Sequence, residues 1–163
     1  MINSIKKEDI VLIRVKYADY AENRLKLIEG GDWIDVFCER VSVNGEIKDG
    51  PFVQYNVGDT VHVDLGIAME LPEKHEAHLL PRSSTFRKYG LIQTNSMGII
   101  DNSYRGDNDW WSMEFYATRK SGLQKGVRIG QFRLVKNMAK ETLIEVLTLG
   151  NDDRGGRGST GEF

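Results

Sequence analysis

The sequence has few of the residues that define several functional classes. Of 163 residues, one is cysteine, three are histidine and three are proline. A lone Cys38 cannot form an intramolecular disulfide, and there are too few Cys and His residues for a zinc site built from them. We therefore expect any metal ion to be held by oxygen ligands.

Basic excess and long apolar runs are also missing. The formal net charge is -2, whereas a non-specific nucleic-acid binder usually carries a clear excess of Lys and Arg. No apolar run is long enough to cross a bilayer, and residues 1–15 lack the apolar core and cleavage site of a signal peptide. We expect a cytoplasmic protein, and a few local arginines would suffice to bind a nucleotide.

The segments that are present predict an all-β fold. They are short, often alternate apolar with polar residues, and are rich in β-branched and aromatic side chains. Turn signals such as Asn44-Gly45 and Lys125-Gly126 separate them, with the spacing of an antiparallel sandwich or barrel. The predicted strands lie within residues 9–15, 33–43, 59–69, 76–81, 110–117, 127–136 and 142–149.

Helix signals are confined to short stretches. Residues 83–89 predict one helix, begun by a serine cap and ended by Gly90, while residues 16–28 fit either a short helix or a loop. From Gly150 the chain becomes polar and glycine-rich. We expect one β domain over residues 1–149 and a flexible tail over residues 150–163.

Two segments carry residues suited to phosphate chemistry. At residues 81–84, where a strand gives way to the helix, backbone N–H groups, serine hydroxyls and Arg82 would converge on an anion. The tail at residues 155–161 resembles a phosphate-cradling loop, although it lacks the Lys and following helix of a P-loop. Each segment has a simpler interpretation. Residues 81–84 would be the start of a capped helix with a surface arginine, and residues 155–161 would be a disordered linker.

A third segment, residues 95–107, places a carboxylate directly after two β-branched residues. Asp101 at a strand end would orient or deprotonate a water molecule, and Tyr104 would pack on a sugar or base. The alternative is a hairpin in which Asp101 caps its own turn and Tyr104 belongs to the core.

The order and spacing of these segments resemble the five motifs of the trimeric dUTP pyrophosphatases. The matching stretches are residues 31–36, 81–84, 98–106, 126–132 and 158–161. The resemblance implies a jelly-roll-like β-barrel or sandwich that hydrolyses dUTP to dUMP and pyrophosphate. It also implies a homotrimer with sites at the subunit interfaces, each closed by the tail of one chain acting as a lid.

The resemblance also assigns roles. Asp101 would orient the water that attacks the α-phosphorus, Tyr104 would stack under the deoxyribose, and Asn95 with the backbone around Gly98 would read the uracil edge. Asp35 would act through water on Mg²⁺ chelated by the triphosphate. The remaining implied substrate contacts are Arg82, Ser83, Ser84, Gln131, Arg154, Arg157, Ser159 and Thr160.

The sequence departs from the family pattern at three places. Asp32-Trp33 replaces a small Ala-Gly pair, and residues 107–111 form an insertion, for which we expect a surface hairpin. In the tail, Arg157 stands where a phenylalanine would stack on uracil. The guanidinium plane of Arg157 would stack on uracil in place of the phenylalanine ring. Either Arg154 or Arg157 could also bind the γ-phosphate.

Two other functions remain open from the sequence. A dCTP deaminase, or a bifunctional enzyme, would share the fold and resembles this chain at residues 82–84 with Arg87, and at Glu114, which would be its acid/base. Glu114 would otherwise be an outward residue of an alternating strand. The second is a non-catalytic regulatory binding protein on the same scaffold, against which the presence of Asp101, Tyr104 and Gln131 together argues.

Overall fold

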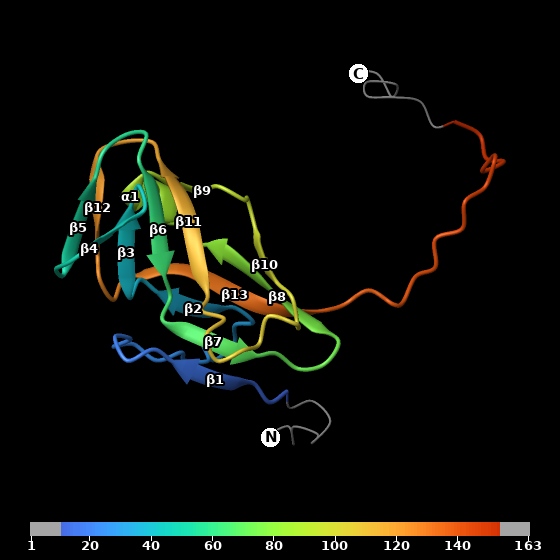
Figure 1. The fold of residues 1–163 in the computed structure, drawn as a ribbon, viewed down its shortest axis with the longest axis horizontal. Coiled ribbons are helices and arrows are strands. Elements are labelled where there is room, and N and C mark those ends of the chain that lie inside the picture. The colour runs from blue at the N-terminus through green and yellow to red at the C-terminus, as the bar shows by residue number, and fades with distance from the viewer. Residues whose placement is uncertain (1–10, 154–163) are drawn as a thin grey trace.

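The computed structural model describes residues 11–153, and its regular structure is almost entirely β (Figure 1). None of the helices in this part of the chain has the length and apolar composition needed to cross a membrane. In chain order the elements are β1 (Arg14–Tyr17), β2 (Ile34–Phe37), β3 (Arg40–Val43), β4 (Glu46–Lys48), β5 (Phe52–Tyr55), β6 (Thr60–Asp64), β7 (Ile67–Glu70), β8 (His75–Pro81), α1 (Thr85–Tyr89), β9 (Leu91–Gln93), β10 (Gly98–Ile100), β11 (Ser112–Ala117), β12 (Ser121–Gln124) and β13 (Arg128–Lys136).

Two antiparallel sheets form the body. One has the order β10-β8-β13-β2 and the other β4-β3-β6-β11-β9, with two-stranded ribbons β1-β7 and β5-β12 beside them. Trp111, from the segment that leads into β11, packs edge-on against Phe132 of β13 with ring centroids 5.2 Å apart, and both side chains are fully buried. The predicted all-β, sandwich-like fold is therefore confirmed, and the described sheets do not close into a barrel.

Two segments expected to be single strands are each divided between sheets. Residues 33–43 break at Cys38-Glu39 into β2 and β3, and residues 59–69 break at Leu65-Gly66 into β6 and β7. Gly66 has φ +62°, and the Asp64 carboxylate accepts its N–H at 2.9 Å. The second break was hidden in the sequence because apolar residues flank Gly66 on both sides.

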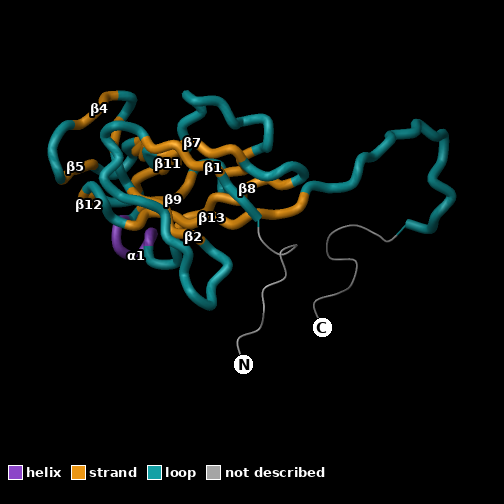
Figure 2. The backbone as a smooth tube through the Cα atoms, turned by 90° about the horizontal axis from the view of Figure 1, so that it is seen from below, coloured by secondary structure: helices purple, strands orange, loops and turns teal. Residues whose placement is uncertain are grey.

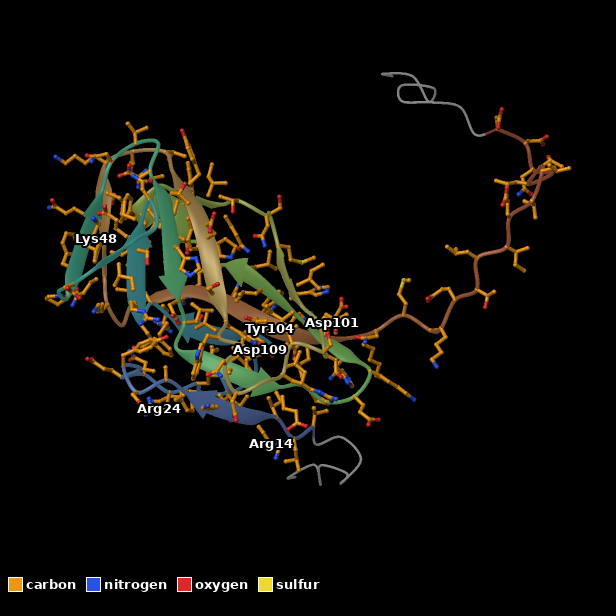
Figure 3. All side chains as sticks on the ribbon, in the orientation of Figure 1. Arg14, Arg24, Lys48, Asp101, Tyr104 and Asp109 are labelled. Atoms are coloured by element: carbon orange, nitrogen blue, oxygen red, sulfur yellow. The ribbon has the colours of Figure 1, made fainter. Side chains whose placement is uncertain are left out.

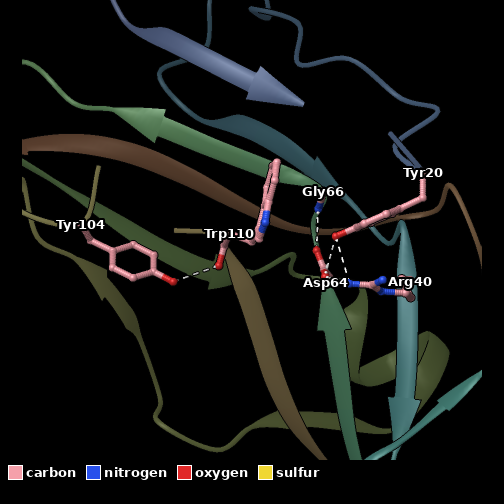
Figure 4. Close-up of polar contacts among 6 residues, drawn as sticks. All are labelled: Tyr20, Arg40, Asp64, Gly66, Tyr104 and Trp110. Atoms are coloured by element: carbon pink, nitrogen blue, oxygen red, sulfur yellow. Dashed lines mark hydrogen bonds and ion pairs between the residues drawn. The ribbon is translucent and has the colours of Figure 1, made fainter. Parts of the chain in front are cut away.

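The carboxylate of Asp64 also binds the segment before β2. The Tyr20 hydroxyl donates to it at 2.7 Å and the Arg40 guanidinium at 2.8 Å (Figure 4). After β1 the chain up to residue 28 forms turns and loop, so the loop alternative for residues 16–28 is correct. The expected strand at residues 9–15 is present only from Arg14 onward among the described residues.

Local turn chemistry was predicted more accurately than strand boundaries. Asn44 and Gly45 have φ of 51° and 83°, as a tight turn between β3 and β4 requires. Gly90 ends α1 in the left-handed region with φ 69°, and its N–H donates to the Phe86 carbonyl at 2.7 Å. The expected serine cap is wrong, because Ser84 occupies the N-cap position without a side-chain cap hydrogen bond.

The strand predicted at residues 142–149 is also wrong. Beyond β13 the described chain has no strand, and it runs away from the body as an exposed arm, residues 137–153 (Figures 1 and 2). Its apolar side chains are exposed, Leu143 at 97% and Leu147 at 107%. A strand needs a neighbour for its backbone hydrogen bonds, and residues 142–149 pair with no strand in the described part of the chain.

Gly130 in β13 provides a test of the packing between the two sheets. A Cβ at this position would lie 2.4 Å from Met113 Sδ and 3.0 Å from the Leu80 carbonyl oxygen, and Met113 is only 1% exposed. We expect Gly130→Ala to lower the free energy of unfolding by about 1–3 kcal/mol, measured by urea denaturation.

The control is the same glycine substitution in a Met113→Val background, where Sδ and Cε are gone. It should cost less there, because the side chain that overlaps the new methyl group has been shortened. An equal cost in both backgrounds would contradict the proposed overlap.

Candidate active site

Three of the predicted site residues meet on neighbouring strands of the first sheet. Gln131 of β13 lies opposite Asp35 of β2 on one side and Leu80 of β8 on the other, and Arg82 follows the end of β8. Paired residues in a sheet project to the same face, and so do residues two apart along a strand. Asp35, Arg82 and Gln131 therefore share one face, and we call them the anion cluster.

Asp35 forms ion pairs with two arginines, Arg82 and Arg128. Its Oδ1 lies 2.9 Å from Arg82 Nε, and its Oδ2 lies 3.0 Å from Arg128 Nη1. Asp35 is 8% exposed, whereas the Arg82 and Arg128 side chains retain 28% and 52% exposure. One carboxylate thus holds two guanidinium groups in place at the surface, with a net positive charge suited to phosphate.

The start of α1 is held against the same cluster. The Thr85 hydroxyl, in a residue 1% exposed, donates to the Ile129 carbonyl of β13 at 2.8 Å. This bond fixes the position of Ser83 and Ser84 next to the strand that carries Gln131. Ser83 is exposed and Ser84 half-buried, so both remain close to the surface where a phosphate would approach.

Four further predicted residues lie along and around β10, an edge strand that pairs only with β8 among the strands of residues 11–153. Asn95 precedes β10, Gly98 begins it, and Asp101 and Tyr104 follow its end. Asn95, Asp101 and Tyr104 are exposed, and Gly98 is buried. We call these four residues the β10 row, and Figure 3 shows Asp101 and Tyr104 close together at one end of it.

Asp101 is ionised at neutral pH. The Ser103 N–H donates to Asp101 Oδ1 at 2.7 Å, and hydrogen bonds from the side chain and the backbone of Ser103 hold the pKa of Asp101 below its usual range. The Asp-capped turn considered from the sequence is thus present, since the Tyr104 N–H also donates to the Asp101 carbonyl at 3.0 Å. The same turn leaves the carboxylate open to solvent and charged.

Tyr104 is held by the insertion for which the sequence offered no role beyond a surface hairpin. Its hydroxyl donates to the Trp110 carbonyl at 3.2 Å (Figure 4), and its side chain remains 41% exposed rather than joining the core. The Gly106 N–H donates to Asp109 Oδ2 at 2.6 Å and closes the loop. The insertion therefore contacts Tyr104 through the Trp110 backbone, and the expected surface hairpin is wrong, because residues 107–111 form no strand pair and Trp111 is fully buried.

Within one chain the anion cluster and the Asp101 end of the β10 row are far apart. Ile100 pairs with Ala77, so Asp101 lies level with Glu76, whereas Arg82 follows Pro81 at the opposite end of β8. This difference along a strand corresponds to about 20 Å. Groups that act on one phosphate must each lie within about 3 Å of it.

Other predicted positions are less informative. Glu114 is an exposed residue of the alternating strand β11, 3.7 Å from His62, in the sheet that does not carry the anion cluster. Arg87 is exposed on α1. Arg154, Arg157, Ser159 and Thr160 lie outside the residues that the structure describes.

The donor set at this site bears on how a metal would bind. Between residues 11 and 153 no three His, Cys, Asp or Glu side chains come together as a metal cage. Both oxygens of Asp35 already accept guanidinium groups. The described residues therefore suit a metal ion that arrives bound to a ligand's own oxygens, with the protein contacting it through water.

Comparison with known proteins gives a consistent result. The dUTPase family model matches residues 52–161. The SPbeta prophage-derived deoxyuridine 5'-triphosphate nucleotidohydrolase YosS of Bacillus subtilis is 51% identical over 149 residues, 91% of this chain and 97% of that protein. A deoxyuridine 5'-triphosphate nucleotidohydrolase of a Hydrogenobaculum species is 36% identical over 134 residues, 81% and 85% of the two chains.

Solved structures share the fold at low sequence identity. A dUTPase of Staphylococcus bacteriophage 80alpha, solved with dUpNHpp, has a TM-score of 0.69 at 17% identity and covers 92% of this chain and 98% of its own. A dUTPase of phage phi11 of S. aureus, described with a structural Mg(II) ion, has a TM-score of 0.66 at 14% identity, with 85% and 98% covered. Because the family model matches more than half of the chain and YosS is 51% identical over nearly all of it, the protein belongs to the dUTPase family.

Proposed function

We propose that this protein is a dUTP diphosphatase, which hydrolyses dUTP to dUMP and pyrophosphate by attack of water at the α-phosphorus. The observation that carries the proposal is Asp101, an exposed and ionised carboxylate at the end of β10 beside Tyr104. The relatives named as deoxyuridine 5'-triphosphate nucleotidohydrolases support the substrate. Its compartment would be the cytoplasm, where nucleoside triphosphates are hydrolysed.

The chemistry follows from the charge state of Asp101. Its carboxylate accepts a hydrogen bond from the attacking water and takes up the proton as the new oxygen–phosphorus bond forms. The bond from the α-phosphorus to the bridging oxygen breaks, and that oxygen leaves with the β-phosphate as part of pyrophosphate. Ser103 keeps the carboxylate ionised and oriented.

Binding of the triphosphate is assigned to the anion cluster and the adjacent serines. Arg82 and Gln131 would contact phosphate oxygens, with Ser83 and Ser84 at the start of α1 beside them. The tail residues Arg154, Arg157, Ser159 and Thr160 would complete this binding as a lid, and either tail arginine would contact the γ-phosphate. Such contacts act mainly by positioning and by neutralising charge.

Mg²⁺ is the proposed cofactor, bound by the triphosphate itself. The bound ion would neutralise phosphate charge and supply water ligands for contact with the protein. Both carboxylate oxygens of Asp35 already pair with Arg82 and Arg128, so its main contribution would be to orient these two side chains. Its remaining lone pairs would accept hydrogen bonds from the water ligands of the metal. This division suits a site without a carboxylate cage.

We further propose that the active unit is a homotrimer in which each site is shared between chains. The separation of about 20 Å along β8 supports this, because Asp101 and Arg82 of the same chain cannot serve one α-phosphate. A neighbouring copy that brings its anion cluster to the β10 row would complete the site. Closed cyclic symmetry would then generate equivalent sites around the assembly.

The arm at residues 137–153 supports the same assembly. Its apolar residues Leu143, Ile144 and Leu147 are exposed and are not covered by any other part of residues 11–153. We propose that residues 142–149 pair with an edge strand of another copy, which would supply the backbone hydrogen-bond partners that the described chain lacks. The arm would also carry the tail towards a site on a different chain.

The proposed role of Asp101 predicts the activity of Asp101→Asn. The amide keeps the size of the side chain but cannot accept a proton, so kcat for dUTP should fall by about 10²–10⁴-fold while KM changes little. The measurement is ion-exchange separation of products from dUTP, dCTP, dTTP and UTP with Mg²⁺. The control Asp49→Asn alters an exposed carboxylate between β4 and β5, away from the β10 row, and should retain activity. Ammonia release from dCTP would contradict the assignment.

The hydrogen bonds from Ser103 predict a pH effect. Both bonds stabilise the charged carboxylate, and Ser103→Ala removes the one from the side-chain hydroxyl. The substitution should therefore raise the pKa of Asp101 and move the acid limb of the kcat/KM profile to higher pH. The plateau at neutral pH should remain, because Asp101 is still ionised there. Ser42→Ala on the distant strand β3 is the matched control, and an unmoved acid limb in Ser103→Ala would refute the role of Ser103.

The shared site predicts complementation between two inactive variants. Co-expressed Asp101→Asn and Arg82→Ala chains should regain activity, because about a quarter of the sites in randomly mixed trimers pair an intact Asp101 with an intact Arg82. Each variant expressed alone provides the baseline, and thermal unfolding by circular dichroism checks that both are folded. Activity no higher than either baseline would mean that each site uses one chain only.

A further inference from the structure

Gln93, at the end of β9, is a buried polar residue with no role in the mechanism above. Its side chain is in a residue only 5% exposed, directly beneath the turn that carries Asn95. Its Nε2 donates to Asn95 Oδ1 at 2.8 Å and lies 3.4 Å from the Leu79 carbonyl oxygen, to which it also donates. Its Oε1 is buried without a hydrogen-bond partner among the described residues.

Burial of an unpaired amide oxygen is costly, so an apolar residue of the same size would be expected here for stability alone. The position is also crowded. A Cβ at Gly98 would lie 3.3 Å from Leu79 Cβ and 3.5 Å from Gln93 Nε2. The amide group is therefore packed closely between β8 and the start of β10, in one orientation.

That orientation is dictated by the backbone. A carbonyl oxygen only accepts hydrogen bonds, so the amide atom of Gln93 that faces Leu79 must be the nitrogen. The second hydrogen of this nitrogen points to Asn95, and the atom that receives it must be the oxygen Oδ1. The Asn95 amide nitrogen is then left facing outward, as a donor, towards the surface where the base would lie.

We propose that Gln93 is the positioning residue that makes the site select uracil over cytosine, by fixing the Asn95 amide with its N–H₂ group outward. The inference rests on the proposed function, in which Asn95 reads the pyrimidine edge. Uracil presents a carbonyl oxygen at C4, which accepts from Asn95 Nδ2. Cytosine presents an amino group there, and two donors would face each other.

Selectivity for uracil over cytosine would depend on one hydrogen bond, that from Asn95 Nδ2 to the base. A free asparagine side chain would rotate by 180° and accept from the cytosine amino group, so it would discriminate poorly. An asparagine locked from beneath must leave its donor unpaired against cytosine, and such a mismatch is strongly rejected. The unpaired Oε1 of Gln93 is consistent with a residue kept for selectivity at a cost in stability.

The test is Gln93→Met, whose unbranched side chain fills the same space without donors. We expect the ratio of kcat/KM for dUTP to that for dCTP to fall by about tenfold or more, while kcat for dUTP changes by less than about twofold, since the variant touches neither Asp101 nor the anion cluster. Gln93→Leu is the second variant, in case the first does not fold. Leu91→Met, on the same buried face of β9, is the control and should leave the ratio unchanged.

A double-mutant cycle shows whether Gln93 acts through Asn95. In an Asn95→Ala background, Gln93→Met should have no further effect on the ratio, because the amide that it orients is gone. A ratio that is unchanged in Gln93→Met and Gln93→Leu, or one that falls equally in the Asn95→Ala background, would overturn the proposal. A wild-type protein that hydrolyses dUTP would still uphold the proposed function in that case, whereas a wild-type protein inactive on dUTP would remove both.

Discussion

The antiparallel register of β8 is the constraint on which the site depends. This strand pairs with β10 on one side and β13 on the other, so it fixes the relative positions of Arg82, Asp101 and Gln131. Arg82 lies at one end beside Gln131, and Asp101 lies level with the other end. A shift of one residue would turn each side chain to the opposite face of the sheet. Core residues Leu79 and Ala77, both fully buried, hold the register in place.

The local chemistry of the site could be predicted from the sequence because it depends on neighbours in the chain. The end of a helix at Gly90, the turn at Asn44-Gly45 and the carboxylate after β10 all follow from short patterns. Strand limits could not be predicted where apolar residues continue through a change of sheet, as at Leu65-Gly66. The ion pairs of Asp35 were also beyond reach, since they join residues up to 93 positions apart. The strand expected at residues 142–149 failed for the related reason that none of the strands described in residues 11–153 pairs with it.

Polar groups near the proposed base and phosphate sites are oriented by hydrogen bonds to backbone carbonyl groups. Thr85 donates to the Ile129 carbonyl, Gln93 to the Leu79 carbonyl, and Tyr104 to the Trp110 carbonyl. A backbone carbonyl has one chemical role and is fixed by the sheet, so it imposes a single orientation on the donor above it. Side chains held in this way lose little further freedom when a ligand binds, which favours both affinity and selectivity.

In the proposed homotrimer, a site shared between chains would link catalysis to assembly. Within residues 11–153 of one chain, Asp101 follows the edge strand β10, and the anion cluster lies at the opposite end of β8. An isolated chain would therefore bind phosphate and hold an ionised carboxylate without combining them in one reaction. The exposed apolar arm would favour the proposed assembly. Burial of its side chains against another copy stabilises the complex by about 25 cal/mol for each Å² of apolar surface removed from water. The same burial that joins the chains would thus complete the active site, so the free energy of assembly also supplies the preorganisation that hydrolysis requires.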